Sequence, residues 1–246
     1  MSGVAVLLIA VGCADIVRRL SSHRWTAVVT GPAVAVVTAL LCGLWHLGDL
    51  VLIGIAAISA VAWEVSSAHA ERVGGRRQAV PVALFATALT VLIVLSGLGS
   101  PVTGAVKAWA AWAAVPGLGE VEPTRLVIVI GVVLLQLMTG NQLVRLLLGS
   151  VGSVKPAGEP QPSDRLKGGR LLGPMERLLI LGLGLAGQLA AATAVLAAKS
   201  IIRFPEINAQ KARESGGIGI DDVTEYFLVG SFASWIVALG GLALTQ

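Results

Sequence analysis

Long apolar runs, each ended by a short polar stretch, divide this chain into seven segments. The runs cover about 3–20, 25–45, 50–64, 80–98, 124–148, 174–202 and 223–244. A helix needs about 20 mainly apolar residues to cross the hydrocarbon core of a bilayer. The pattern therefore predicts an all-α fold: a polytopic transmembrane bundle of about seven helices, forming a single domain over residues 1–246.

One further apolar stretch is too short to cross a membrane. It lies at about 102–115, is rich in alanine and contains Lys107, Trp109 and Trp112. Because Trp favours the headgroup level of a bilayer, we interpret this stretch as an interfacial or re-entrant helix. A loop outside the cytoplasm is the alternative.

Composition indicates that lipid covers most of the surface. Hydrophobic residues make up 55% of the chain and charged residues only 13%, whereas a soluble domain is about 25% charged. The 30 glycines are spread through the apolar runs. Small residues let helices approach closely where no hydrophobic force drives their association, so these helices should pack tightly.

The net charge is +4, and the Lys and Arg residues lie in short connections between the apolar runs. This placement is typical of topology signals, so we exclude nucleic acid as a partner. With the N-terminus outside, the inner side holds twelve Lys and Arg residues and the outer side six. The inner set is Arg18, Arg19, Arg24, Arg72, Arg76, Arg77, Arg145, Lys155, Arg165, Lys167, Arg170 and Arg177, and the outer set is Lys107, Arg125, Lys199, Arg203, Lys211 and Arg213. This asymmetry predicts a multi-pass protein of the cell membrane with its N-terminus outside and its C-terminus in the cytoplasm. The first run should be retained, because no basic residue precedes it and Arg18 and Arg19 follow it.

The run at 174–202 carries the first candidate site. Arg177, Gln188 and Lys199 are spaced by eleven residues, and eleven steps of a helix return to nearly the same face. Arg203 follows one turn later. Snorkelling of the cations to the two membrane surfaces explains the stripe structurally. A ligand or ion pathway is the functional alternative.

A second candidate site lies at the end of the same run. Lys199 and Arg203 are followed by Glu206, and Glu225 begins the last run on the side predicted to be outside. These residues could form a salt-bridge clasp between the last two helices. They could instead bind an anion or a lipid headgroup.

Other polar residues inside the apolar runs have simpler expected roles. Gln136, Asn141, Gln142 and Arg145 should bind neighbouring helices through hydrogen bonds. Asp15 and Glu64 are isolated carboxylates near the inner ends of their runs, and we expect Asp15 to pair with Arg18 or Arg19 and Glu64 with Arg72. A proton relay would need such groups on several adjacent helices at mid-depth.

Several tempting motifs lack their structural context. Gly182, Gly184 and Gly187 match a dinucleotide-binding pattern but lie inside an apolar helix with no preceding strand. The three histidines, His23, His46 and His69, are scattered, and Cys13 and Cys42 have no partner at ligand spacing. The sequence therefore predicts no catalytic residue, cofactor or metal.

The last third of the chain, about 166–244, resembles the C-terminal membrane portion of a family of bacterial integral membrane proteins of unknown function. The matching residues are Gly168, Gly169, Arg170, Gly173, Glu176, Arg177, Ala198, Lys199, Ser200, Ile201, Arg203, Phe204, Glu225, Tyr226, Gly230 and Ser231. The resemblance implies a bacterial cytoplasmic-membrane location. It implies no mechanism.

Three hypotheses for function follow from these patterns. The leading one is a non-enzymatic membrane protein that binds or moves a small anionic or lipidic ligand. The second is a structural or partner-binding subunit of a membrane complex, and the third is a membrane-embedded enzyme acting on lipid. Membrane lipid is the expected partner, and the glycine-rich and alanine-rich helices would permit a homo-oligomer or a complex with another membrane protein.

Overall fold

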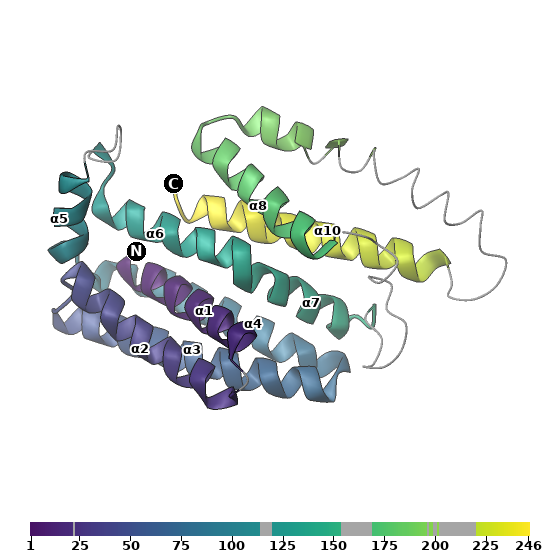
Figure 1. Cartoon of the computed structure of the whole chain (residues 1–246), viewed down its shortest axis with the longest axis horizontal. Coiled ribbons are helices and arrows are strands. Elements are labelled where there is room, and N and C mark those ends of the chain that lie inside the picture. The colour runs from purple at the N-terminus through teal and green to yellow at the C-terminus, as the bar shows by residue number, and fades with distance from the viewer. Residues whose placement is uncertain (22, 114–119, 154–168, 196, 199–200, 202–219) are drawn as a thin grey trace.

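The computed structural model describes the whole chain except residues 22, 114–119, 154–168, 196, 199–200 and 202–219. Every regular element of the described residues is helical (Figure 1). The elements are α1 (Ser2–Leu20), α2 (Arg24–Cys42), α3 (Leu47–Val73), η1 (Gly75–Gln78), α4 (Ala79–Val94), η2 (Leu95–Leu98), α5 (Gly104–Trp112), α6 (Pro123–Leu134), the π-helical turn η4 (Leu135–Thr139), α7 (Gly140–Ser150), α8 (Gly169–Leu185) and α10 (Ile220–Ala243). The predicted all-α bundle is confirmed.

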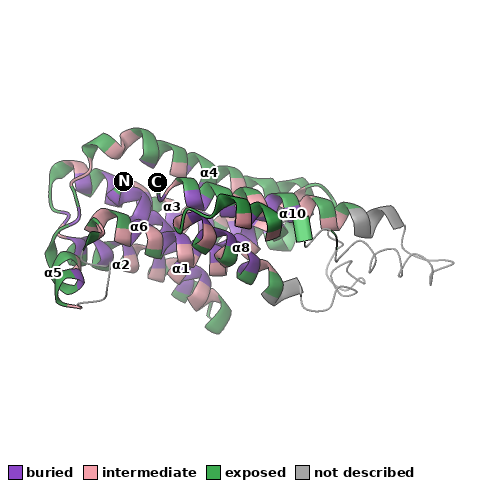
Figure 2. Ribbon diagram, turned by 90° about the horizontal axis from the view of Figure 1, so that it is seen from above, coloured by how far each residue is buried: buried purple, intermediate pink, exposed green. Residues whose placement is uncertain are grey.

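Five stretches of the described residues are long and apolar enough to cross a membrane. They are Trp25–Cys42, Leu47–Val73, Gly75–Leu98, Pro123–Ser150 and Glu225–Ala243. Apolar side chains cover their outer faces, as Val36, Leu40 and Leu41 do on α2. Much of α4 is exposed (Figure 2), and its exposed side chains include Val80 and Val94. Such a surface matches hydrocarbon, so the chain is a multi-pass membrane protein.

The helix α1 lies among these stretches and packs against α2, α3 and α6. Twelve of its 19 residues are buried. Glycines allow the close approach: a Cβ on Gly12 would lie 2.8 Å from the Cβ of Leu134, and a Cβ on Gly131 would lie 2.9 Å from the Cβ of Leu8. The predicted packing through small residues is confirmed for this pair of helices.

The two chain termini lie close together at one end of the bundle (Figures 1 and 2). Ser2 lies beside Gly99, which follows α4. The Thr245 carbonyl oxygen accepts a hydrogen bond of 3.0 Å from Arg125 Nε in the first turn of α6. This differs from the prediction that the termini lie on opposite sides of the membrane.

The difference arises at the helix predicted over 174–202, which is not continuous. The helix α8 ends at Leu185, Gly187 adopts a left-handed φ of 73°, and a new helical stretch begins after Gln188. A left-handed φ costs glycine little and is common where helices end. Contacts of Glu176 with Trp235 and of Gly184 with Leu242 show that α8 and α10 run in the same direction. Both helices therefore begin at the end of the bundle opposite the chain termini (Figure 1).

The short helix α5 occupies the stretch predicted at 102–115. It contacts α2 and α6 at the end of the bundle that carries the termini. Its Trp109 and Trp112 are exposed, as are Trp45 at this end and Trp25 at the other end. Exposed tryptophans at both ends are typical of the aromatic belts of membrane proteins.

Candidate functional site: a buried carboxylate pair

A cluster of buried polar side chains joins α1 to α3. The Asp15 side chain is 1% exposed and the Glu64 side chain 2%, and the two carboxyl groups lie within hydrogen-bonding reach of each other. Each residue lies about four positions, roughly 6 Å, from the middle of its helix. Two carboxyl groups thus share a site that water outside the bundle does not reach.

Arg18 lies between the two carboxyl groups. It follows Asp15 by nearly one helical turn, which places both side chains on one face of α1. Its NH2 group is 2.8 Å from Asp15 Oδ1, and its NH1 group is 3.7 Å from Glu64 Oε2. One guanidinium therefore faces two carboxyl groups, so the cluster has a charge of −1 when both are ionised and is neutral when one proton binds.

Two further side chains fix the position of Asp15. The indole Nε1 of Trp63 donates a hydrogen bond of 3.2 Å to Asp15 Oδ1, and the Thr139 side chain of η4 lies close to the Asp15 carboxyl. Trp63 is fully buried, and its ring packs 5.4 Å from that of Phe85 on α4. Residues from α3, α4 and η4 thus hold the carboxylate of α1 in one place.

Each carboxyl group keeps one oxygen without a hydrogen-bond donor. These oxygens are Asp15 Oδ2 and Glu64 Oε1. A buried polar atom without a partner costs about 1–3 kcal/mol. A carboxyl group gains a donor when it is protonated, so a proton on either group could supply a bond between them.

A second polar group links α3 to α7 nearer the end of the bundle. Glu71 Oε1 accepts a hydrogen bond of 2.6 Å from Gln142 Nε2 and lies 3.4 Å from Arg145 NH2. The Arg145 side chain is 63% exposed and that of Glu71 31%. Glu64, Ser67 and Glu71 follow one another on one face of α3 at helical spacing, so this face leads from the buried pair toward the end of the helix.

Arg177 of α8 lies in a separate buried network, and the prediction that it snorkels to the surface was wrong. Its side chain is among the largest fully buried ones. Its Nε and NH2 groups donate to the Gln136 carbonyl oxygen at 3.1 and 2.8 Å, NH1 donates to Ser234 Oγ at 3.1 Å, and NH2 donates to Asn141 Oδ1 at 2.7 Å. These partners lie on η4, α7 and α10. The arginine therefore ties three segments together at the middle of the α6–α7 span.

Of the other predicted site residues, the structure describes Gln188 and Glu225. Gln188 is exposed in the turn after α8, so Arg177 and Gln188 do not share one continuous helix. Glu225 is exposed at the start of α10 and accepts a hydrogen bond of 3.2 Å from Ser153 Oγ, beyond α7. Lys199, Arg203 and Glu206 lie outside the described residues.

Other sequence-based pairings have mixed outcomes. The prediction that Gln136, Asn141, Gln142 and Arg145 bind neighbouring helices is confirmed, with Gln136 Nε2 donating to the Val237 carbonyl oxygen at 3.0 Å. The pairing of Asp15 with Arg18 is confirmed. The pairing of Glu64 with Arg72 is wrong, because Glu64 faces Arg18 while Arg72 Nε donates to the Ala68 carbonyl oxygen.

Within the described part of the chain, no three His, Cys, Asp or Glu side chains form a group that could hold a metal ion. Comparison of the chain with protein-family models, with curated proteins and with solved structures found no match.

Proposed function

We propose that this membrane protein is a proton-linked carrier of a small ligand, in which the Asp15–Glu64 pair binds and releases one proton. The observation that carries the proposal is the burial of two carboxyl groups with one arginine between them. Ionisable groups inside a membrane are costly and are typical of proton relays and substrate paths. The ligand class that we propose is the small anionic or lipidic one that the sequence favours.

The proton would change which helices Arg18 holds together. With both carboxyl groups ionised, the guanidinium attracts Asp15 of its own helix and Glu64 of α3 at once. A proton on Glu64 removes that second attraction and leaves Arg18 paired with Asp15 alone. The α1–α3 contact then has two states of different strength, which is what coupling of a proton to a movement requires.

The alternative is a structural or partner-binding subunit, in which the cluster only joins α1 to α3. The Arg18–Glu64 contact, which joins α1 to α3, favours this reading. The two functions differ in one measurable property. A carrier must change the protonation of the pair with pH, whereas a purely structural cluster keeps one protonation state.

Infrared spectroscopy of the purified protein in liposomes tests the proposal. Wild-type protein should show the carbonyl stretch of a protonated carboxyl group, and its amplitude should change with pH. Glu64→Gln and Asp15→Asn should each remove the titrating part of the band, because a single remaining carboxyl pairs with Arg18 and keeps its charge.

Glu225→Gln is the matched control, because Glu225 is an exposed carboxylate on another helix. It should leave the titrating band unchanged. A wild-type spectrum without a titrating carboxyl band would refute the carrier and leave the structural subunit. Retention of the band in both Glu64→Gln and Asp15→Asn would place the proton elsewhere.

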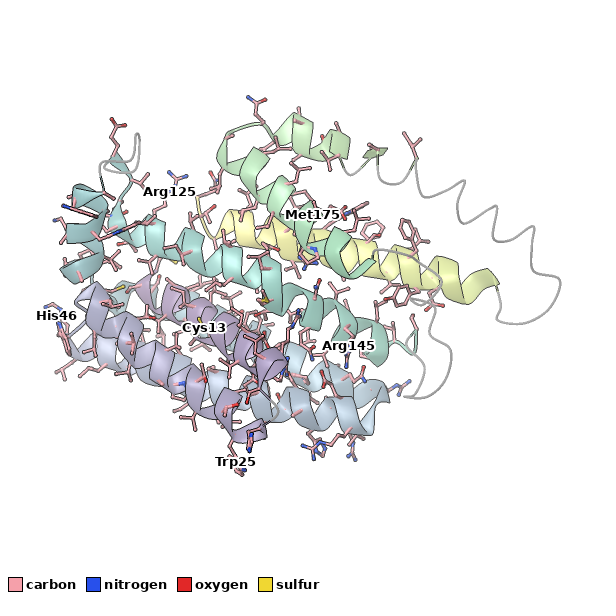
Figure 3. The ribbon with its side chains drawn as sticks, in the orientation of Figure 1. Cys13, Trp25, His46, Arg125, Arg145 and Met175 are labelled. Carbon is pink, nitrogen blue, oxygen red and sulfur yellow. The ribbon has the colours of Figure 1, made fainter. Side chains whose placement is uncertain are left out.

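The orientation that we propose has both termini outside the cell. Of the Lys and Arg residues in described elements, eight lie toward the end where α1 finishes, two lie toward the end with the termini, and Arg177 is buried between them. The first group is Arg18, Arg19, Arg24, Arg72, Arg76, Arg77, Arg145 and Arg170, and the second is Lys107 and Arg125. Figure 3 labels Arg145 and Arg125 on these opposite parts of the bundle. Positive residues stay predominantly in the cytoplasm, so the Arg-rich end should face it.

Cysteine labelling in intact cells tests this orientation. In a Cys13→Ala, Cys42→Ala background, a cysteine at Gln246 should react with a membrane-impermeant thiol reagent, and one at Val73 should react only after the cells are opened. If the cysteine at Val73 reacted in intact cells and the one at Gln246 were protected, the orientation would be the reverse of the one that we propose.

A further inference from the structure

The geometry points to a proton route: we infer that protons reach the Asp15–Glu64 pair from the end where α3 finishes, through Glu71 and a water molecule bound at Ser67. This inference rests on the proposed function. It assigns roles to two residues outside the buried pair. It also states from which side of the membrane the pair exchanges protons.

The spacing along α3 suits a chain of short transfers. Ser67 follows Glu64 by three residues and Glu71 follows Ser67 by four, which correspond to rises of about 4.5 and 6 Å. Residues three or four apart on a helix are neighbours, but Ser67 Oγ makes no direct hydrogen bond to Glu64 or Glu71. A bridging water molecule would therefore complete the step on each side of Ser67.

The Ser67 hydroxyl also indicates a bound water molecule on this face of α3. Ser67 is completely buried, and its Oγ has no hydrogen-bond partner among the described residues. A serine hydroxyl can both donate and accept, as each member of a proton chain must. A buried water needs two to four polar partners, and Ser67 Oγ and the unpartnered Glu64 Oε1 supply two of them.

Glu71 forms the outer end of this route. It is partly exposed, and Gln142 and Arg145 of α7 hold its carboxylate in place. The charged groups beside the route are Asp15, Arg18 and Arg19 of α1, Glu64 and Glu71 of α3, and Arg145 of α7. The α4 sequence has no charged residue. A partly exposed carboxylate is well placed to exchange protons with the solvent.

The opposite direction is closed by apolar packing. Between the buried pair and the end with the termini, α1 and α3 contribute Leu7, Leu8, Val11, Leu52 and Ala56, each at most 1% exposed. None of these side chains can carry a proton. Exchange in this conformation therefore favours the end that carries Arg72, Arg76 and Arg77.

The test is the rate at which the carboxyl band of the pair shifts when the liposomes are transferred from H2O to D2O. Ser67→Ala and Glu71→Gln should each slow this exchange by about tenfold or more, the factor that corresponds to about 1.4 kcal/mol in a barrier. Neither change should abolish the band, because Asp15 and Glu64 remain. Glu71→Asp keeps a titratable group and should slow exchange less than Glu71→Gln.

The neighbouring serine provides a matched control. Ser66 lies on an adjacent face of α3, and its Oγ donates to the Trp63 carbonyl oxygen at 3.3 Å. Ser66→Ala should exchange at the wild-type rate. Wild-type rates in both Ser67→Ala and Glu71→Gln, with the band present, would overturn the route while leaving the proton site intact. Absence of the band in wild-type protein would instead refute the proposed function itself.

Discussion

Replacing Arg177 with methionine should lower the free energy of unfolding by about 3–5 kcal/mol, the usual cost of removing one partner from a buried charged network. The guanidinium donates four hydrogen bonds to Gln136, Asn141 and Ser234. Methionine fills similar space but leaves these three oxygen atoms without that donor. The loss should fall on the contacts of α8 with η4 and α10.

Unfolding by increasing SDS in mixed micelles measures this effect. Arg177→Lys should be intermediate, because an ammonium keeps the charge but cannot present two N–H groups to the Gln136 carbonyl oxygen as the guanidinium does. Arg125→Gln is the control, since Arg125 is exposed and donates one bond to a backbone oxygen. It should change stability by less than about 1 kcal/mol. A similarly small change for Arg177→Met would show that the network contributes little.

The Arg177 network also gives a reason for the π-helical turn in the longest buried span. In η4 the Gly140 N–H bonds to the Leu135 carbonyl oxygen, five residues earlier, so the regular α-helical pattern is interrupted. The Gln136 carbonyl oxygen accepts two bonds from Arg177, and the Met138 carbonyl oxygen accepts one of 3.3 Å from Arg19. Such turns are frequent at functional sites, and this one lies between α1 and α8.

The lengths of the apolar runs predicted most helices well. The predictions at 3–20, 25–45, 80–98 and 223–244 differ from α1, α2, α4 with η2, and α10 by at most three residues at either end. Hydrocarbon thickness fixes how long such a run must be, and polar residues mark where it ends. Local sequence therefore contains the information needed to find these helices.

Glu64 shows why the candidate site was harder to find. The sequence prediction ended the third helix at this residue, because a charge commonly marks a membrane surface. The helix continues to Val73, so Glu64 lies inside the span instead of at its end. Its partner Arg18 belongs to another helix, and apolar patterning alone does not pair helices. The sequence signal for this site was the presence of two carboxylates in otherwise apolar runs, and the sequence alone indicated them only as isolated groups.

The break after α8 was also hidden from the sequence. Residues 174–202 have enough apolar side chains for one long helix, and a glycine inside such a run is tolerated. The helix α8 ends at Leu185, and Gly187 has a left-handed φ, so Arg177 and Gln188 are not on one helix. The inference of a common face for these residues required an unbroken helix. The Arg177 network involves α7, α8 and α10 and was therefore not predicted.

Replacing Arg18 with glutamine should be as damaging as the Arg177 change at neutral pH, about 3–5 kcal/mol, because it leaves two buried carboxyl groups without their cation. The loss should shrink as the pH falls. Free Asp and Glu side chains titrate near pH 4, whereas the folded variant must bind a proton at higher pH to avoid two adjacent buried charges. A folded state that binds more protons than the unfolded state becomes more stable as the pH decreases.

Unfolding by SDS tests whether Arg18 balances the carboxylate pair. The measurement compares Arg18→Gln, Glu64→Gln and the double variant between about pH 5 and 8, where free carboxyl groups are ionised. The double variant should be more stable at neutral pH than Arg18→Gln alone, because it no longer has two buried carboxylates, and its stability should depend less on pH. Arg19→Gln is the neighbouring control: the Arg19 side chain makes an exposed hydrogen bond to a backbone oxygen, and its loss should cost less than about 1 kcal/mol. Strictly additive changes with no pH dependence would mean that Arg18 does not balance the carboxylate pair. Non-additivity that disappears at low pH would instead show that one proton can replace the arginine, which is the property that a proton-linked carrier needs at this site.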